Sequence, residues 1–270
     1  MDFKRIQLIF LIVFIMIDIF LFNMFNENRN LQTESVSQQS NSNEVLKQMQ
    51  NDQISVAFTP SDKPLDGYYL AATPDNSLKN DAKNLQNQSV RFSNGVLRST
   101  IKLKWGKDSI SKIMKTRFYI AHGNQYEYSK DLSNSNTIVY LQKNDNGTFY
   151  SNVYGQIRFN ISSDGLVLGY TQSYLSNIKV LREKAPIISA SKALYNLYQY
   201  NEIPNNSKIE WEQMYYTKLL QDNQVYIPTW VIAFTTGDSS NVQIKRINAF
   251  TGSMLNSSNT KDAINSFATN

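Results

Sequence analysis

The chain has 270 residues, no cysteine and a formal net charge of +5. The absence of cysteine excludes disulfide bonds, thiol chemistry and a lipid-modified cysteine. An affinity for anionic lipid or wall polymer would account for the positive charge, but Lys and Arg are dispersed and acidic residues lie between them. We therefore interpret the charge as a determinant of solubility.

An apolar run at residues 6–25 dominates the start of the chain. Its sequence is IQLIFLIVFIMIDIFLFNMF, and Lys4 and Arg5 precede it. At about 1.5 Å per helical residue, such a run crosses a hydrocarbon core of roughly 30 Å. The two basic residues place the N-terminal end in the cytoplasm by the positive-inside rule. The sequence therefore predicts a cytoplasmic N-terminus at residues 1–5, one transmembrane helix at residues 6–25 and an extracellular remainder, which excludes nucleic acid as a partner.

A cleaved signal peptide is the alternative interpretation of this segment, because signal peptides and anchors share a basic start and an apolar stretch. The run is longer than the apolar core of a usual signal peptide. It ends in LFNMFNE, without the pair of small residues that signal peptidase requires. We therefore expect a retained anchor.

Two polar side chains, Gln7 and Asp18, lie inside the predicted anchor. An acidic group in the membrane costs on the order of 2.5 to 3.5 kcal/mol, so it usually has a partner. Both residues belong to one helical stripe by their spacing. The stripe consists of Gln7, Leu11, Phe14, Asp18 and Phe22, and it continues to Phe25. We predict that this stripe packs against another transmembrane helix; the alternative is that Asp18 is protonated or reaches outward to the headgroups.

The remaining chain divides by composition. Residues 26–42 are rich in Asn, Gln, Ser and Glu, and we expect a flexible tether there. From residue 43 onward, short runs of aromatic and aliphatic residues with few Gly and Pro predict an ordered α+β domain. We expect two related extracellular lobes at residues 43–144 and 145–256, each with a helix laid on an antiparallel sheet, and a disordered tail at residues 257–270.

Apolar spacing and turn residues predict the individual elements. In the first lobe we expect helical turns after residue 43, strands from residue 54 and at residues 67–74, a helix at residues 75–85, a hairpin turning at residues 93–95, a helix at residues 109–118, and strands at residues 125–128 and 137–142. In the second lobe we expect a hairpin with a two-residue turn centred on Asp164 and Gly165, a helix capped by Ser189, and strands at residues 208–216, 225–235 and 242–250.

The residues typical of catalytic sites are scarce. His122 is the one histidine, and its place in the sequence AHGNQ favours a turn residue over a catalyst. Ser-x-x-Lys pairs occur at Ser109 and Ser189, but they recur throughout this Ser- and Lys-rich chain, and the companion motifs of penicillin-recognising enzymes are absent. We expect no metal and no cofactor, since histidines and cysteines do not cluster.

Glu210 and Glu212 flank Trp211, so a regular strand would place both carboxylates on one face roughly 7 Å apart, within the range of paired-acid glycosidases. Alternating charges are also usual on the solvent face of a strand, with Ile209, Trp211 and Gln213 buried on the other face. We favour the second interpretation and expect no enzyme.

The chain resembles the YycI family, also called WalI, of membrane-anchored regulators of the WalK/WalR two-component system in low-GC Gram-positive bacteria. The resemblance rests on the opening MDFKRIQLIF, the acid near the outer end of the apolar run, GYYLA at residues 67–71, IPTW at residues 227–230 and INAFTG at residues 247–252. The chain departs from the family at Phe3, where Trp is frequent, and in a long polar tether.

The resemblance implies an extracellular two-lobed domain similar to part of a partner, YycH, and a regulatory role exerted with YycH on the sensor histidine kinase WalK, which governs cell-wall metabolism. It also implies that the transmembrane helix carries much of the contact with the kinase. The alternative function is a membrane-anchored, wall-associated enzyme or ligand-binding protein that uses the cleft between the lobes.

Overall fold

The computed structural model describes residues 3–33, 38–151, 153–220, 223–237 and 241–255. The chain forms two compact units, Met1–Asp52 and Gln53–Asn270. Each unit is described by itself below.

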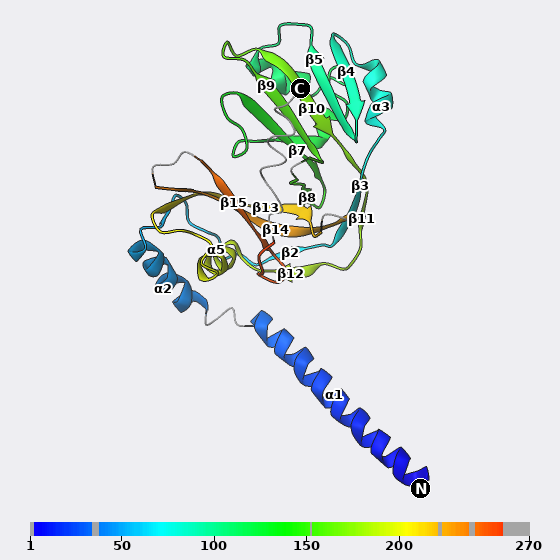
Figure 1. The fold of residues 1–270 in the computed structure, drawn as a ribbon, viewed down its shortest axis with the longest axis vertical. Helices are drawn as coiled ribbons and strands as arrows, with labels where there is room; N and C mark the ends of the chain where they lie inside the picture. Colours follow the sequence, from blue (N-terminus) through cyan, green and yellow to red (C-terminus); the bar gives the residue numbers. More distant parts are fainter. Residues whose placement is uncertain (1–2, 34–37, 152, 221–222, 238–240, 256–270) are drawn as a thin grey trace. The chain divides into compact units, whose positions relative to one another are not determined.

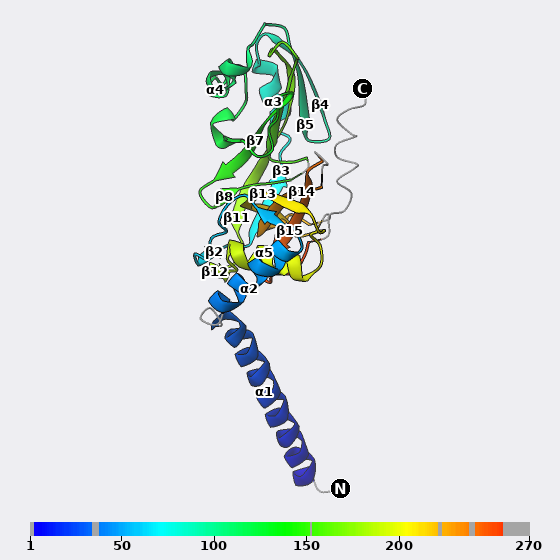
Figure 2. The same ribbon diagram turned by 90° about the vertical axis from the view of Figure 1, so that its left-hand side faces the viewer.

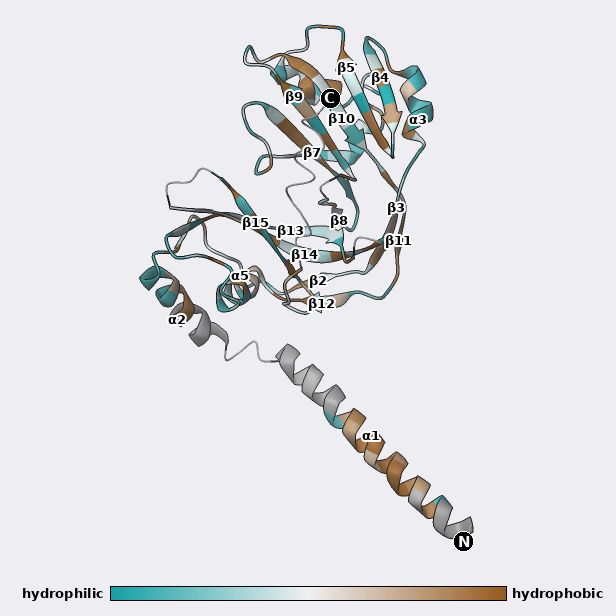
Figure 3. Cartoon of the chain, viewed as in Figure 1, coloured by the Kyte–Doolittle hydropathy of each residue, from teal (hydrophilic) through white to brown (hydrophobic). Residues whose placement is uncertain are grey.

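The first unit is helical. Helix α1 spans Phe3–Thr33, and helix α2 spans Gln38–Asn51. The apolar part of α1 is the brown section of this helix in Figure 3. Within the described residues, no helix is both long enough and apolar enough to cross a membrane.

The predicted flexible tether at residues 26–42 is largely helical in the structure. Helix α1 continues to Thr33, and α2 begins at Gln38, while residues 34–37 lie outside the described part of the chain. The segment contains no Pro or Gly, and its Gln, Glu and Arg residues have good helix propensity, so its polar composition is compatible with helix. The expected tail at residues 257–270 lies outside the described residues.

The second unit contains two large sheets, which form the two groups of strands in Figure 1. Sheet I consists of β1 (Ser55–Val56), β3 (Leu70–Pro74), β11 (Leu175–Val180), β13 (Ser207–Lys218), β14 (Val225–Thr236) and β15 (Gln243–Asn248). Its strand order is β1-β13-β14-β3-β11, and β15 also pairs with β14. All its pairs are antiparallel except that of β1 with β13.

Sheet II is antiparallel throughout its described pairs. It consists of β4 (Gln88–Ser93), β5 (Val96–Ile101), β6 (Tyr126–Ser129), β7 (Thr137–Asn144), β8 (Gly147–Thr148), β9 (Gln156–Ile161) and β10 (Val167–Ser173). The order is β4-β5-β10-β9-β7-β6, with β8 paired to β7. A separate small pair joins β2 (Leu65–Gly67) to β12 (Ala185–Ile187).

The two sheets do not divide the chain at residue 145, where the sequence predicts a boundary between lobes. Strands β9 and β10 follow residue 145 yet belong to sheet II, while β1 and β3 precede it and belong to sheet I. Sheet II is therefore built from a continuous middle segment, and sheet I from the segments on both sides of it. Apolar periodicity predicts where strands lie, but the pairing of each strand depends on contacts between residues that are far apart in the sequence.

The predicted hairpins form, and their turns explain their positions. Between β4 and β5, Asn94 and Gly95 have φ angles of 52° and 76°, the left-handed conformation that a two-residue hairpin turn of type I′ requires. Between β9 and β10 the loop is longer than the predicted two-residue turn. Ser162 donates its backbone N–H to the Leu166 carbonyl, and Gly165 is left-handed at 73° while Asp164 is not.

The helices of the second unit are short except for α5. Helix α5 spans Ala190–Gln199, and the Ser189 hydroxyl accepts a hydrogen bond from the backbone N–H of Lys192, which confirms the predicted cap. The helices predicted at residues 75–85 and 109–118 are brief turns. They form α3 (Leu78–Asp81), η1 (Ala82–Asn84), η2 (Lys107–Ser109) and α4 (Ile110–Ile113), and a further turn, η3, spans Gly123–Gln125.

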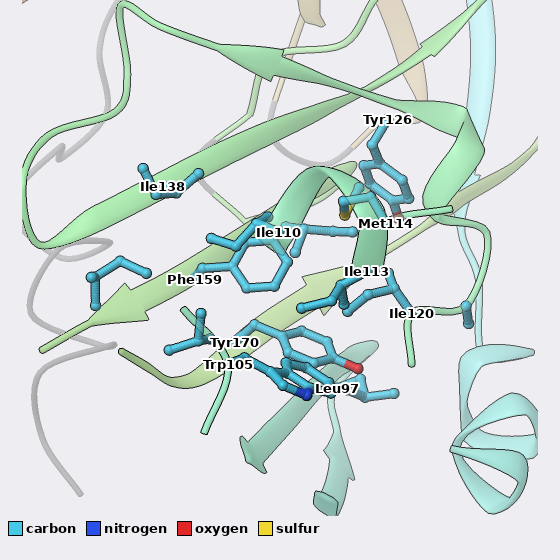
Figure 4. Packing of buried hydrophobic residues seen from close by; sticks show 14 of the residues in the cluster. Leu97, Trp105, Ile110, Ile113, Met114, Ile120, Tyr126, Ile138, Phe159 and Tyr170 are labelled. Carbon is cyan, nitrogen blue, oxygen red and sulfur yellow. The ribbon is translucent and has the colours of Figure 1, made fainter. Parts of the chain in front are cut away.

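A hydrophobic cluster lies on one face of sheet II. Ile110 and Ile113 of α4 pack with Phe159 of β9 and Tyr170 of β10 (Figure 4). Figure 2 shows α4 beside the strands of this sheet. Residues of the opposite face, such as Val139, pack with Val231 and other residues of sheet I. The two sheets of the second unit are therefore held together by direct apolar contact.

Candidate functional site

The stripe predicted on the first helix lies on one face of α1. Because α1 is continuous from Phe3 to Thr33, the spacing of the five residues keeps them within one sector of the helix. All five are exposed: Gln7, Leu11, Phe14, Asp18 and Phe22. The side chain of Phe25, at the end of the stripe, lies outside the described residues. The contact that this face makes with another helix stays a prediction.

The two acids of β13 point to opposite faces of sheet I, which corrects the expected common face. A β-bulge interrupts the pairing, because Ile209 opposes Phe234 while Trp211 opposes Ala233. The carboxylate of Glu210 accepts a hydrogen bond from Thr235 at 3.2 Å and pairs with Lys208 at 2.8 Å.

The bulge places Glu212 on the same face of β13 as Ile209, and this side chain is buried. Glu212 opposes Ile232, and Ile209 opposes Phe234. Since Ile232 and Phe234 are two residues apart on β14 and point to the same face, Glu212 and Ile209 share that face as well. Thr235 and Trp211 lie on the other face, with Glu210. The paired-acid geometry is therefore absent at these two residues, and the expected burial of Trp211 and Gln213 on one common face with Ile209 is also wrong.

Glu212 is an unusual buried group. Its residue is 9% exposed, and neither carboxylate oxygen has a hydrogen-bond partner within the described part of the chain. Burial raises the pKa of Glu212 to about 8, because an apolar environment disfavours the charged form. Lys245 lies on the same face, two strands away, but its ammonium pairs with Glu202 at 2.6 Å. The side chain of Glu212 is therefore protonated over much of the neutral pH range.

His122 occupies a turn, as the sequence predicts. Its backbone is left-handed, with a φ of 53°, immediately before η3. The ring stacks on Tyr174 with centroids 4.5 Å apart, and Nε2 lies 3.1 Å from Asp81 Oδ2. These contacts connect three segments of the lobe, which is a structural role.

The serines of the Ser-x-x-Lys pairs also serve the backbone. Ser189 caps α5, and the Ser109 hydroxyl donates to the Gly106 carbonyl at 2.6 Å. In the part of the chain that the structure describes, no three His, Asp or Glu side chains are grouped so that they could hold a metal ion. Neither serine is arranged as a nucleophile next to a base in these contacts.

Comparison with protein families decides the classification. The family described as YycI protein matches residues 32–250, which include both sheets. The chain belongs to the YycI family. Membership in the YycI family fits a regulatory role in the WalK/WalR system and confirms the resemblance seen in the sequence. The match begins near the end of α1, so the stripe on that helix is outside it.

Other comparisons add little to the YycI assignment. No curated protein matches the chain. Among solved structures, the chain is similar to an uncharacterized protein from Eubacterium rectale ATCC 33656, at 12% identity and a TM-score of 0.44, with 76% of this chain and 91% of that chain covered. It is also similar to the C-terminal domain of Bacillus megaterium YpeB, at 13% identity and a TM-score of 0.35, with 78% and 94% covered. At these TM-scores, neither likeness bears on function.

Proposed function

We propose that this YycI-family protein is a non-enzymatic, single-pass membrane regulator. In this proposal, residues 6–25 anchor it, the N-terminus is cytoplasmic and the two-sheet unit is extracellular. Together with a YycH-like membrane protein, it modulates a WalK-type sensor histidine kinase that controls cell-wall metabolism. The observation that carries the proposal is the family match over residues 32–250.

The sequence of the first helix supports the anchor. The run at residues 6–25 is apolar except for Gln7, Asp18 and Asn23, and its length as a helix suits a hydrocarbon core of roughly 30 Å. In such a core, Asp18 costs on the order of 2.5 to 3.5 kcal/mol on insertion scales. A polar partner on a neighbouring helix lowers that cost, which gives the stripe a physical reason to associate.

Unequal contact with two kinase states is sufficient for regulation. A bound protein shifts a conformational equilibrium only by the difference between its affinities for the two states. Couplings of this kind are typically about 1 to 3 kcal/mol, which changes the ratio of states from severalfold to about a hundredfold. We propose that the α1 stripe supplies this difference to the kinase helices, while the extracellular unit holds the YycH-like partner.

Site-specific crosslinking in living cells tests the anchor contact. A photo-crosslinking amino acid is placed at Phe14 on the stripe or, as the control, at Met16 on the opposite side of α1. The proposal predicts that the position 14 probe captures the kinase and the position 16 probe does not. Adding Asp18→Leu to the position 14 probe should reduce capture, with membrane insertion unchanged. Equal capture from both positions, or capture that ignores Asp18→Leu, contradicts the contact.

Transcription of the kinase's target genes tests the regulatory role itself. Reporter output is compared between the wild-type strain, a deletion strain and a strain whose residues 6–25 are exchanged for an unrelated transmembrane helix. We expect both altered strains to differ from wild type. Unchanged output in both strains would remove the regulatory role, whatever the crosslinking shows.

A paired-acid hydrolase loses the observation that suggested it. The paired-acid form of the enzymatic alternative rested on Glu210 and Glu212, and the bulge in β13 directs these side chains to opposite faces. Glu210 is engaged by Lys208 and Thr235, and Glu212 is buried. We therefore do not retain a paired-acid hydrolase as a second candidate function.

A further inference from the structure

Three arginines lie in one row across sheet II. Their positions follow from the strand register: Arg91 of β4 opposes Arg98 of β5, Arg98 opposes Thr171 of β10, and Thr171 opposes Arg158 of β9. Residues directly opposite one another on neighbouring strands share a face. Since neighbouring strands lie about 4.8 Å apart, the row extends over three strand spacings, or roughly 14 Å. The four strands are adjacent in Figure 1.

The arginine row is on the face that the short helices do not cover. The core residues Leu97, Phe159 and Tyr170 alternate with the row along the same strands, so they face the other side, where α4 packs. Arg91 and Arg98 are exposed, and Arg158 is half-buried. In the described part of the chain, none of the three guanidinium groups forms an ion pair or hydrogen bond.

The four strands of the row carry many hydrogen-bond donors and no acid on this face. Glu127 of β6, two strands beyond β9, lies on the same face, and its carboxylate pairs with Lys143. The positions on this face of β4, β5, β9 and β10 are Ser89, Arg91, Ser93, Val96, Arg98, Thr100, Gln156, Arg158, Asn160, Gly169, Thr171 and Ser173. Like charges directly opposite each other, as Arg91 and Arg98 are, disfavour the sheet. A bound anion turns this unfavourable arrangement into a favourable one.

Positive charge continues from the row toward sheet I. Tyr150 has a pKa that burial raises, and Arg246 of β15 and Arg158 both oppose this rise. The guanidinium groups of two different sheets therefore act on one phenol. Burial lowers the pKa of Arg158, since a guanidinium removed from water is unfavourable without a counter-charge.

We propose that the arginine row is a binding surface for a phosphate-bearing polymer outside the membrane. Guanidinium groups bind phosphate oxygens through two parallel hydrogen bonds, and the neighbouring hydroxyls of Ser89, Thr100 and Thr171 supply further donors. A polymer with regularly spaced phosphates engages several arginines at once. This inference rests on the extracellular placement in the proposed function and goes beyond that function, because it requires no contact with the kinase.

The composition of the face favours a hydrophilic polymer over a docked protein. Stable protein interfaces have an apolar centre. The apolar side chains on this face are already covered: Val96 is 6% exposed, and Val139, the next residue along the row, is 0% exposed. The exposed part offers charge and hydroxyl groups without an apolar anchor. An acidic protein segment would also bring negative charge to this face, so the test must distinguish carboxylate binding from phosphate binding.

Fluorescence polarisation with labelled short-chain polyphosphate tests the inference. The full chain is used in micelles of an uncharged detergent, at several salt concentrations. An exposed charge pair contributes up to about 1 kcal/mol, or about fivefold in affinity. The Arg91→Gln/Arg98→Gln double variant should therefore bind up to about 25-fold more weakly, and its affinity should depend less steeply on salt.

A matched variant controls for net charge. The Lys112→Gln/Lys115→Gln variant removes the same charge from exposed residues in and just after α4, on the covered side of the sheet. Its affinity should stay within about twofold of wild type, since distant exposed charges are screened. Equal weakening in both double variants contradicts a defined surface.

Two further measurements make the assignment specific. Arg158→Lys keeps the charge but loses the planar fork, so it should bind several-fold more weakly while circular dichroism and the thermal midpoint stay unchanged. If Arg158→Lys unfolds, the exposed double variant alone decides the outcome. Labelled poly-glutamate is the carboxylate probe. Binding of poly-glutamate as tight as that of polyphosphate, or unchanged polyphosphate binding in the Arg91→Gln/Arg98→Gln variant, overturns the proposal.

Discussion

The Glu212→Gln variant is expected to remove a large pH dependence of folding stability. Glu212 is buried, lacks a hydrogen-bond partner in the described chain, and has a pKa raised by burial from 4.5 to about 8. Between pH 4.5 and about pH 8, Glu212 keeps its proton in the folded state but has released it in the unfolded state. The free energy of unfolding therefore falls as pH rises, by about 1.4 kcal/mol per pH unit.

The stabilising contribution of the proton is complete below about pH 4.5 and is lost as pH rises to about 8. The total loss over this window is about 5 kcal/mol, of which about 3 kcal/mol has occurred by pH 7. A domain of this kind has a free energy of unfolding of about 5 to 15 kcal/mol, so the effect is a substantial fraction of its stability. Glutamine does not titrate, so the variant lacks this slope.

Urea unfolding followed by tryptophan fluorescence, from about pH 5 to about pH 8, measures the slope. The full chain in uncharged detergent is compared with Glu212→Gln and with the control Glu210→Gln, which alters the half-exposed acid on the other face of the same strand. The control should keep the wild-type slope. Parallel pH profiles for wild type and Glu212→Gln would refute the burial argument, whatever the absolute stability of the variant.

Two substitutions test local features of the second unit. Gly123→Ala should lower the free energy of unfolding by about 1 to 3 kcal/mol, because an added Cβ would lie 2.0 Å from the Met114 carbonyl oxygen, and the thermal midpoint measures this loss. Ser189→Ala should lower it by about 1 kcal/mol, because the Lys192 N–H loses its cap, whereas Ser189→Asp should retain the cap; an equal loss in both would contradict this account.

Local signals in the sequence predict local structure well. Asn94 and Gly95 define a hairpin because their backbones must be left-handed, and Ser189 marks a helix start because its hydroxyl caps a free N–H. Apolar spacing predicts strands at residues 208–216 and 225–235, and β13 and β14 match these ranges to within a few residues. Each of these features depends on residues that are neighbours in the chain.

Features that depend on distant pairing are beyond the reach of the sequence patterns. The bulge at Glu210 is defined by its opposition to β14, and the membership of β9 and β10 in sheet II is defined by β5 and β7. The arginine row is an intermediate case. The predicted turn at Asn94 and Gly95 already sets Arg91 opposite Arg98, but Arg158 joins them only through β10.

The bulge in β13 links the buried acid to the contact between the sheets. It allows Ile209 to face one side of sheet I while Trp211 and Tyr215 face sheet II, where Tyr215 stacks on Tyr150 with centroids 5.5 Å apart. The same register turns Glu212 inward. Burial of Tyr150 and Tyr215 contributes about 1.5 to 3 kcal/mol for each side chain, and the two together offset the roughly 3 kcal/mol that burial of Glu212 costs at pH 7. The unfavourable acid is thus compatible with a stable sheet, because the register that buries it also creates the apolar contact between the two sheets.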